Sequence, residues 1–88
     1  MTPKEILLNA GFEDVFLLEN CSYEDAIIGV TTDNRAVYSF SKMVDWLMST
    51  ENFTYEDAVE WIEYNTIRSL DYYGPNAPII MYDVEDYK

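Results

Sequence analysis

The sequence predicts a single α+β domain, in which a small mixed or antiparallel sheet, a hairpin plus one or two strands, is packed by about three helices. Three patterns predict this class: helix-start signals near residues 2 and 54, a β-branched hairpin pattern between them, and a short apolar run after the last proline. With 88 residues and 49% hydrophobic composition, the chain can bury one core and is too apolar for disorder. We expect residues 1–88 to form one acidic domain with a short acidic C-terminal tail.

The N-terminal part is expected to hold a short helix and a short strand. Thr2-Pro3-Lys4-Glu5 has the layout of a capping box with proline at the first helical position, and Gly11 lies where such a helix would end. Residues 14–20, "DVFLLEN", form a continuous apolar run between polar residues. That run predicts a buried strand, with a helix as the alternative for so few positions.

The middle of the chain predicts a hairpin followed by a helix. Residues 26–32 and 35–40 are extended patterns on either side of Asp33-Asn34, a turn pair that tolerates positive φ. Ser39 or Ser41 can then cap a helix through "KMVDWLMST", residues 42–50. This helix is apolar over most of its circumference, so we expect it to be largely buried.

A pentapeptide motif occurs twice, as "SYEDA" at residues 22–26 and as "TYEDA" at residues 54–58. In each copy a hydroxyl can accept hydrogen bonds from free backbone N–H groups, and two carboxylates complement the helix dipole. The second copy predicts the longest helix, ending near residues 70–73 before Gly74-Pro75, with a last strand in "IIMYDV". In the first copy "IIGV" limits the helix to one turn that leads into a strand. We interpret the motif as a helix-start signal and not as a duplication.

The charge and the rare residue types narrow the classes of function. Seventeen acidic residues against five basic ones give a net charge of −12, which disfavours nucleic acid and anionic membranes as direct partners and favours a basic protein surface. The chain has no histidine and one cysteine, Cys21, which excludes Cys/His zinc sites and histidine-based catalysis. We therefore expect no enzyme, no cofactor and no metal site.

The layout of the N-terminus lacks the pattern of a signal peptide, and no apolar run reaches the ~20 residues of a membrane span. We expect a protein of the bacterial host cytoplasm. The alternative to a protein without any small-ligand site is weak Ca²⁺ or Mg²⁺ binding by the carboxylates near the C-terminus.

The candidate partner-binding residues are mostly acidic. On a wheel of 100° per residue, Glu56, Glu60, Glu63 and Asp71 share an arc of about 80°, with Ile67 inside it and Tyr64 at its edge. Another side of the same wheel, predicted to face the core, holds Tyr55, Ala58, Val59, Ile62, Thr66, Ser69 and Leu70. Two further acidic clusters are Glu24 and Asp25 with Asp33 around the hairpin, and Asp83, Glu85 and Asp86 in the tail.

The aromatic residues divide into two expected groups. Trp46 and Trp61 are expected in the core. Tyr72 and Tyr73 lie beside Asp71, and Tyr82 and Tyr87 lie in the acidic tail, so we expect these tyrosines at a surface. Tyrosine among carboxylates suits a binding surface because it offers a large area at a low entropic cost.

From "SYEDAIIGVTTDNRAVYSFSKMVDWLM" through "YEDAVEWIEYNTIRSLDYYGPNAPIIMY", the chain resembles a group of small acidic proteins of bacterial phages and mobile elements. The resemblance implies a genomic context and no catalytic residues. By analogy of size and charge, it is similar to anti-CRISPR and other anti-defence inhibitors, many of which occupy nucleic-acid channels.

We therefore expect a non-enzymatic inhibitor, a monomer or homodimer, that mimics nucleic acid and binds a basic nucleic-acid-binding protein, with a CRISPR effector as the leading candidate. The alternative is a phage regulatory or structural module that self-associates through Ile67 and the aromatic residues, its acidity serving solubility. A small-ligand or metal-binding protein is the third class.

Overall fold

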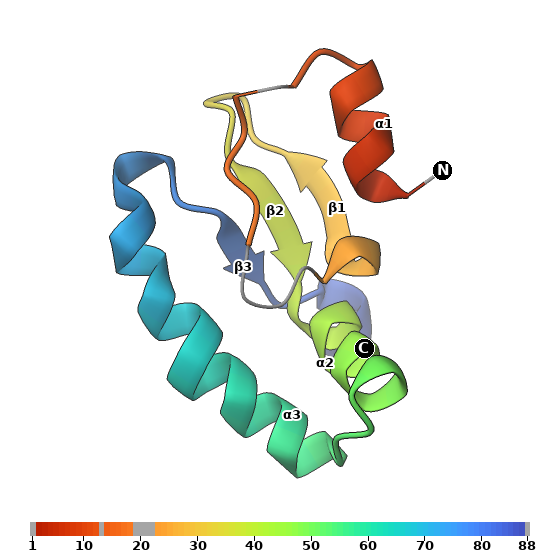
Figure 1. Cartoon of the computed structure of the whole chain (residues 1–88). Helices are drawn as coiled ribbons and strands as arrows, with labels where there is room; N and C mark the ends of the chain where they lie inside the picture. The colour runs from red at the N-terminus through yellow and green to blue at the C-terminus, as the bar shows by residue number, and fades with distance from the viewer. Residues whose placement is uncertain (1, 13, 19–22, 88) are drawn as a thin grey trace.

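The computed structural model describes residues 2–12, 14–18 and 23–87 and confirms an α+β fold with a small mixed sheet (Figure 1). Within these residues, three α-helices and three strands carry the fold, and 3₁₀ or π-helical segments of three to seven residues lie between and after them. In chain order the elements are α1 (Pro3–Asn9), η1 (Glu24–Ala26), β1 (Ile27–Val30), β2 (Ala36–Ser39), α2 (Phe40–Thr50), α3 (Tyr55–Trp61), η2 (Ile62–Ile67), η3 (Leu70–Asn76), β3 (Ile79–Met81) and η4 (Val84–Tyr87).

The three strands lie in the order β1-β2-β3. The pair β1–β2 is the predicted antiparallel hairpin, and Asn34 has the positive φ, 63°, that its turn position requires. The strand β3 pairs with β2 in parallel, so the chain must cross over between them through α2 and α3. Arg35 Nε donates a hydrogen bond of 2.8 Å to the carbonyl of Ala77, which ties the start of β2 to the approach to β3.

The strand predicted at residues 14–20 is wrong over its described part, residues 14–18. This segment is extended but belongs to no sheet. The backbone N–H of Leu18 instead donates to the Tyr38 hydroxyl at 3.0 Å, and the Leu18 side chain is buried. Leu18 therefore reaches the core from a segment outside the sheet, whereas Val15 and Leu17 are half-buried and Phe16 is exposed. A periodicity argument cannot distinguish such a segment from a strand.

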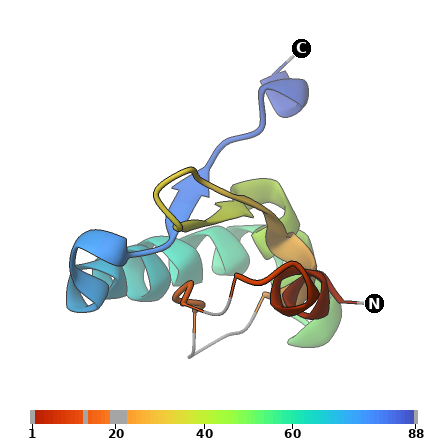
Figure 2. The ribbon, with the colours of Figure 1, turned by 90° about the horizontal axis from the view of Figure 1, so that it is seen from above.

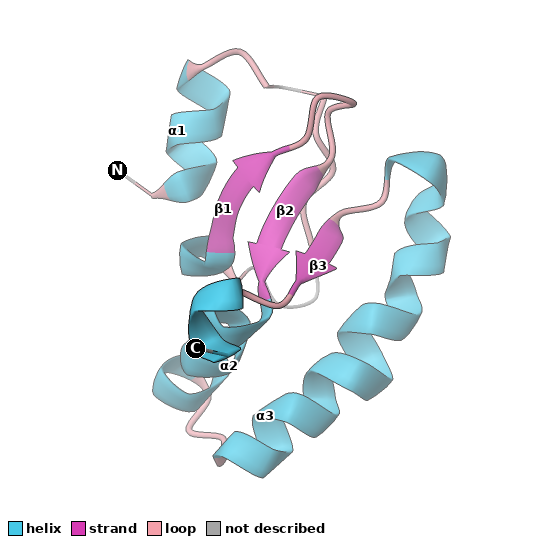
Figure 3. Cartoon of the chain, turned by 180° about the vertical axis from the view of Figure 1, so that it is seen from behind, coloured by secondary structure: helices cyan, strands magenta, loops and turns pink. Residues whose placement is uncertain are grey.

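The core lies between the sheet, α2 and α3. Its fully buried side chains include Tyr38, Met43, Leu47 and Ile62. As predicted, Ser39 caps α2, accepting a hydrogen bond of 3.4 Å from the Lys42 N–H. Figure 2 shows α3 on one side of the sheet and the last turn, η4, standing out on the other, and Figure 3 shows α3 running obliquely past the strands.

In the described part of the chain no helix has the length and apolar character needed to cross a bilayer.

The long helix departs from regular α geometry at η2, which is a π-helical segment. Ala58, Ile62 and Thr66 are all buried although they are spaced four residues apart. In a regular α-helix this spacing drifts by about 40° per step away from one face. A π segment has wider turns, which reduces the rotation per residue and keeps these three side chains directed at the core. The predicted core face is thus confirmed at these positions.

The two copies of the repeated motif fold differently. Tyr23, in the first copy, is fully buried with a left-handed backbone (φ 45°), and its hydroxyl shares a hydrogen bond of 2.8 Å with the Thr66 hydroxyl. The one helical turn predicted there is η1, although Cys21 and the predicted cap Ser22 lie outside the described residues.

The second copy starts α3. Thr54 accepts a hydrogen bond of 3.2 Å from the Asp57 N–H, as predicted for an N-cap. Tyr55, which the wheel assigns to the core face, is instead 63% exposed. It is the first residue of the helix, before the turn that packs against the core, so the prediction for this residue is wrong.

Burial of Tyr38 has a consequence for stability at high pH. Desolvation raises the pKa of the Tyr38 phenol above its ordinary value of about 10, the hydrogen bond from Leu18 N–H lowers it in part, and Tyr73 raises it further. Above about pH 10 the unfolded chain therefore releases a proton that the folded chain retains, so the free energy of unfolding falls as pH rises through that range.

We expect denaturant unfolding at a series of pH values to show this fall in the wild type and a shallower one in Tyr38→Phe. The comparison cancels the titration of the other tyrosines and of the lysines, which both proteins share. Equal slopes in the two proteins would show that Tyr38 titrates normally in the folded state.

Candidate partner-binding surface

The acidic face of α3 and η2 is exposed to solvent along its length. Glu56, Glu60 and Glu63 are all exposed, as are Tyr64 and Ile67. The three carboxylates lie about one helical turn apart, at spacings where like charges repel by a few tenths of a kcal/mol per pair. We call these five residues the α3 acidic face.

Both arginines of the chain engage neutral groups. Arg68 lies over the Tyr64 ring at 4.9 Å, and Arg35 donates to the Ala77 carbonyl. Their positive charge is thus directed at a π system and at a backbone dipole. The carboxylates of the α3 acidic face gain little compensation from these two side chains.

Trp61 is a surface residue that sequence reasoning missed. It was expected in the core, but it is 37% exposed and contacts the Phe53 ring edge-on at 5.8 Å. A shallow hollow of 370 Å³ lies beside it, with Asp57, Glu60 and Tyr64 among its lining side chains. Exposed tryptophan among acids is typical of a binding surface, and the signal for it in the sequence is that Trp61 lies outside the predicted core arc of the wheel.

Asp71 and Tyr72 lie beyond the π segment, in the 3₁₀ segment η3. Each extra residue in a widened turn rotates the side chains that follow it by about 100°, relative to their places on the wheel of a regular α-helix. The wheel that groups Asp71 with Glu63 therefore does not apply beyond the π segment, which ends at Ile67. Both Asp71 and Tyr72 are exposed, but they belong to the far end of the helix and not to the α3 acidic face.

The predicted cluster around the hairpin is divided between two ends of a strand. Glu24 and Asp25 are in η1, before β1, whereas Asp33 is at the turn after it and accepts a hydrogen bond from the Thr31 hydroxyl. The four residues of β1 separate these ends by about 13 Å. Asp25 instead lines a hollow of 260 Å³ with Lys42 and Asp45.

The acidic tail is folded and not extended. Val84–Tyr87 forms the turn η4, and the Tyr82 ring packs between Phe40 at 5.0 Å and Tyr87 at 6.3 Å. Asp83 is half-buried, and its Oδ1 atom has no hydrogen-bond partner among the described residues. Glu85 and Asp86 are exposed.

This folded tail completes a groove of 420 Å³ between α2, α3 and η4. Its aromatic lining consists of Phe40, Tyr55, Tyr82 and Tyr87. Its acidic lining consists of Asp45, Glu63 and Asp86. We call this cavity the tyrosine groove. It brings together Glu63 and Asp86, which the sequence predicted as separate binding residues, and adds Asp45 and Tyr55, which it did not predict.

The carboxylates in the described part of the chain do not form a cluster that could bind a metal ion. Among residues 2–12, 14–18 and 23–87, no three Asp, Glu or Cys side chains lie close enough to hold an ion. The acids of the tyrosine groove are thus spread around its wall, an arrangement that suits an organic cation better than a metal ion.

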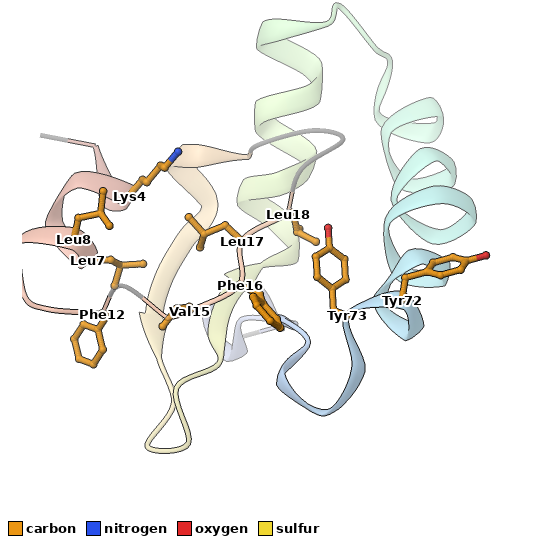
Figure 4. A pocket seen from close by; sticks show the side chains of 10 residues that line it. All are labelled: Lys4, Leu7, Leu8, Phe12, Val15, Phe16, Leu17, Leu18, Tyr72 and Tyr73. Carbon is orange, nitrogen blue, oxygen red and sulfur yellow. The ribbon is translucent and has the colours of Figure 1, made fainter.

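A second groove, of 730 Å³, lies between α1, the extended segment after it and the end of the long helix (Figure 4). Its lining is mainly apolar, and Leu8, Phe12 and Phe16 are exposed to solvent there. Phe16 and Tyr73 face each other across it with ring centroids 6.4 Å apart. Lys4 lies on its rim, so this groove differs in charge from the α3 acidic face.

Comparison of the chain with protein-family models, with curated proteins and with solved structures finds no match. The function of the protein is therefore inferred from the surfaces described above.

Proposed function

We propose that this protein is a non-enzymatic inhibitor that binds a basic, nucleic-acid-binding protein through the α3 acidic face. The observation that carries the proposal is the exposure of Glu56, Glu60 and Glu63 on one helix beside exposed Trp61 and Tyr64. Carboxylates supply charge complementarity, and the aromatic side chains supply the apolar contacts that dominate binding energy in interfaces.

The spacing of the carboxylates supports mimicry of a nucleic-acid strand. Successive turns of a helix place side chains ~5.4 Å apart, which approaches the rise of two nucleotides, about 6.8 Å. The Lys and Arg side chains of a partner's nucleic-acid groove would therefore find the carboxylates of this helix at a spacing similar to that of phosphates. They would also relieve the repulsion between neighbouring acids, which the free protein bears.

The net charge of −12 favours a strongly basic partner and fast, electrostatically steered association. The resemblance to phage proteins makes a CRISPR effector of the host cytoplasm the leading target class. The other acids, including Asp71, Glu24, Asp25 and Asp33, contribute to steering in this proposal and not to the central contact.

The test is to use the tagged protein as bait in a nuclease-treated bacterial lysate, at low salt and at about 0.5 M salt, where screening is nearly complete beyond a few ångströms. We expect one nucleic-acid-binding protein to be recovered at low salt and lost at high salt. Added DNA or RNA should displace it, because a mimic and nucleic acid cannot occupy one groove together. Identification is by mass spectrometry.

Recovery of a partner that still binds nucleic acid while held by the bait would contradict mimicry. Recovery of the protein itself alone, insensitive to salt, would instead indicate the self-associating module. The apolar groove of Figure 4 and exposed Ile67 are the observations that favour this second candidate. Sedimentation of the purified protein distinguishes them, because a tight homo-oligomer that buries Ile67 is expected only of the self-associating module.

A further inference from the structure

We propose that the tyrosine groove receives the guanidinium group of one arginine side chain. The inference rests on the proposed function, since the arginine belongs to the basic partner, and it identifies a second contact beside the α3 acidic face. Glu63 is shared by both surfaces, because it is exposed on η2 and also lines the groove.

The rings of the groove are available to a ligand. Tyr55, Tyr82 and Tyr87 are 63%, 59% and 71% exposed, respectively, whereas Phe40 is buried beneath them. A tyrosine ring attracts a cation to its face, and the attraction grows as the cation loses water. The contacts of Tyr82 with Phe40 and with Tyr87 hold its ring in place, so little further ordering is needed when a ligand arrives.

The acids define the charge of that ligand. Asp45 comes from α2, Glu63 from the long helix and Asp86 from η4, so carboxylates approach the cavity from three elements. An anion would be repelled from every side, and a neutral apolar group would leave the carboxylates desolvated without a partner. A monovalent organic cation satisfies both the acids and the rings.

Arginine fits this lining better than lysine. Its planar guanidinium stacks on aromatic faces, donates to carboxylates in pairs and is more weakly hydrated than an ammonium group. The cavity of 420 Å³ has room for one such side chain with accompanying water. Arginine is also a common side chain in grooves that bind nucleic acid, which connects the ligand to the proposed partner.

The test is a titration with Nα-acetyl-arginine amide, whose only charge is the guanidinium, followed by the aromatic NMR signals of Tyr55, Tyr82 and Tyr87. The matched probes are capped lysine amide, with the same charge, and capped citrulline amide, with the same shape and no charge. We expect saturable shifts at these tyrosines with arginine, weaker binding of lysine and no shift with citrulline. Equal shifts with citrulline or lysine, or shifts centred on Trp61, would overturn the proposal.

Two variants of equal charge locate the site. Glu63→Gln should weaken arginine binding about two- to five-fold, the range for one partly exposed charge contact, whereas Glu56→Gln should leave it unchanged. Tyr82→Leu keeps an apolar side chain and removes the ring, and it should weaken binding by a similar factor. If both glutamine variants weakened arginine binding equally, the binding would reflect general electrostatic attraction. The assignment of the arginine site to the tyrosine groove would then be rejected.

Because the titration uses a small arginine derivative, its result does not depend on the partner protein. Arginine binding without recovery of any nucleic-acid-binding protein would retain the groove and reject the proposed function. Recovery of such a protein, with no arginine binding in the groove, would retain the function and reject the groove.

Discussion

Tyr23→Ala is expected to lower the free energy of unfolding by about 3–5 kcal/mol, whereas Tyr55→Ala should change it by less than about 0.5 kcal/mol. The two residues occupy the same position of the repeated motif. Tyr23 is fully buried, packs against Trp46 with ring centroids 5.3 Å apart and shares its hydroxyl with Thr66. Tyr55 is mostly exposed. Urea unfolding of both variants, followed by circular dichroism, measures the difference.

Two further variants separate the ring of Tyr23 from its hydroxyl. Tyr23→Phe keeps the ring and leaves the Thr66 hydroxyl without this partner, at an expected cost of about 1–3 kcal/mol. Tyr23→Phe combined with Thr66→Val removes both polar groups and should recover part of that loss, because no buried hydroxyl is left unsatisfied. A Tyr23→Ala protein as stable as Tyr55→Ala would show that the first motif copy does not anchor η1 to the long helix.

Reversing Glu56, Glu60 and Glu63 to lysine is expected to weaken partner binding at least ~100-fold, or about 2.7 kcal/mol, because attraction to a basic groove becomes repulsion. The change raises the net charge of −12 by six units, two for each reversal. The control reverses the exposed residues Glu5, Asp14 and Glu51, which gives the same net charge at other places on the surface. Affinities are measured against the recovered partner at several salt concentrations.

The control variant should lose association rate through weaker steering but retain most of its affinity in high salt. Equal losses in the two triple variants would mean that total charge matters and not the α3 acidic face, so the site assignment would fail. The folding of both proteins is checked by their melting temperatures, since all six substituted side chains are exposed.

Local signals in the sequence predicted most of the fold. The caps at Thr2, Ser39 and Thr54 are where hydroxyls satisfy free N–H groups, and the Asp33-Asn34 turn sets the hairpin. The strand expected at residues 14–20 was wrong in its described part because a short apolar run can place one side chain, here Leu18, in the core without pairing in a sheet. The partner of the Leu18 N–H is a tyrosine twenty residues away, which no local pattern can indicate.

The candidate site was predictable as far as the end of the π segment and not beyond it. Glu56, Glu60 and Glu63 are exposed as expected, but the π segment ended the validity of the wheel before Asp71. The tyrosine groove could not be predicted because its walls come from α2, the long helix and η4, which meet only in three dimensions. The one local signal for it was Asp45, a carboxylate on an otherwise apolar stretch of helix between Val44 and Trp46.

The parallel pairing of β2 with β3 has a consequence for how the protein is made. The hairpin can form as soon as it leaves the ribosome, but the hydrogen bond that ties Arg35 to Ala77 spans forty-two positions. Contacts of such long range form late, because the chain between them must first be ordered. Tyr82 and Tyr87 follow β3 directly, so a nascent chain would display the acidic helix before it completes the groove. Charge would thus be ready to attract a partner earlier in synthesis than the aromatic contact that we assign to one arginine.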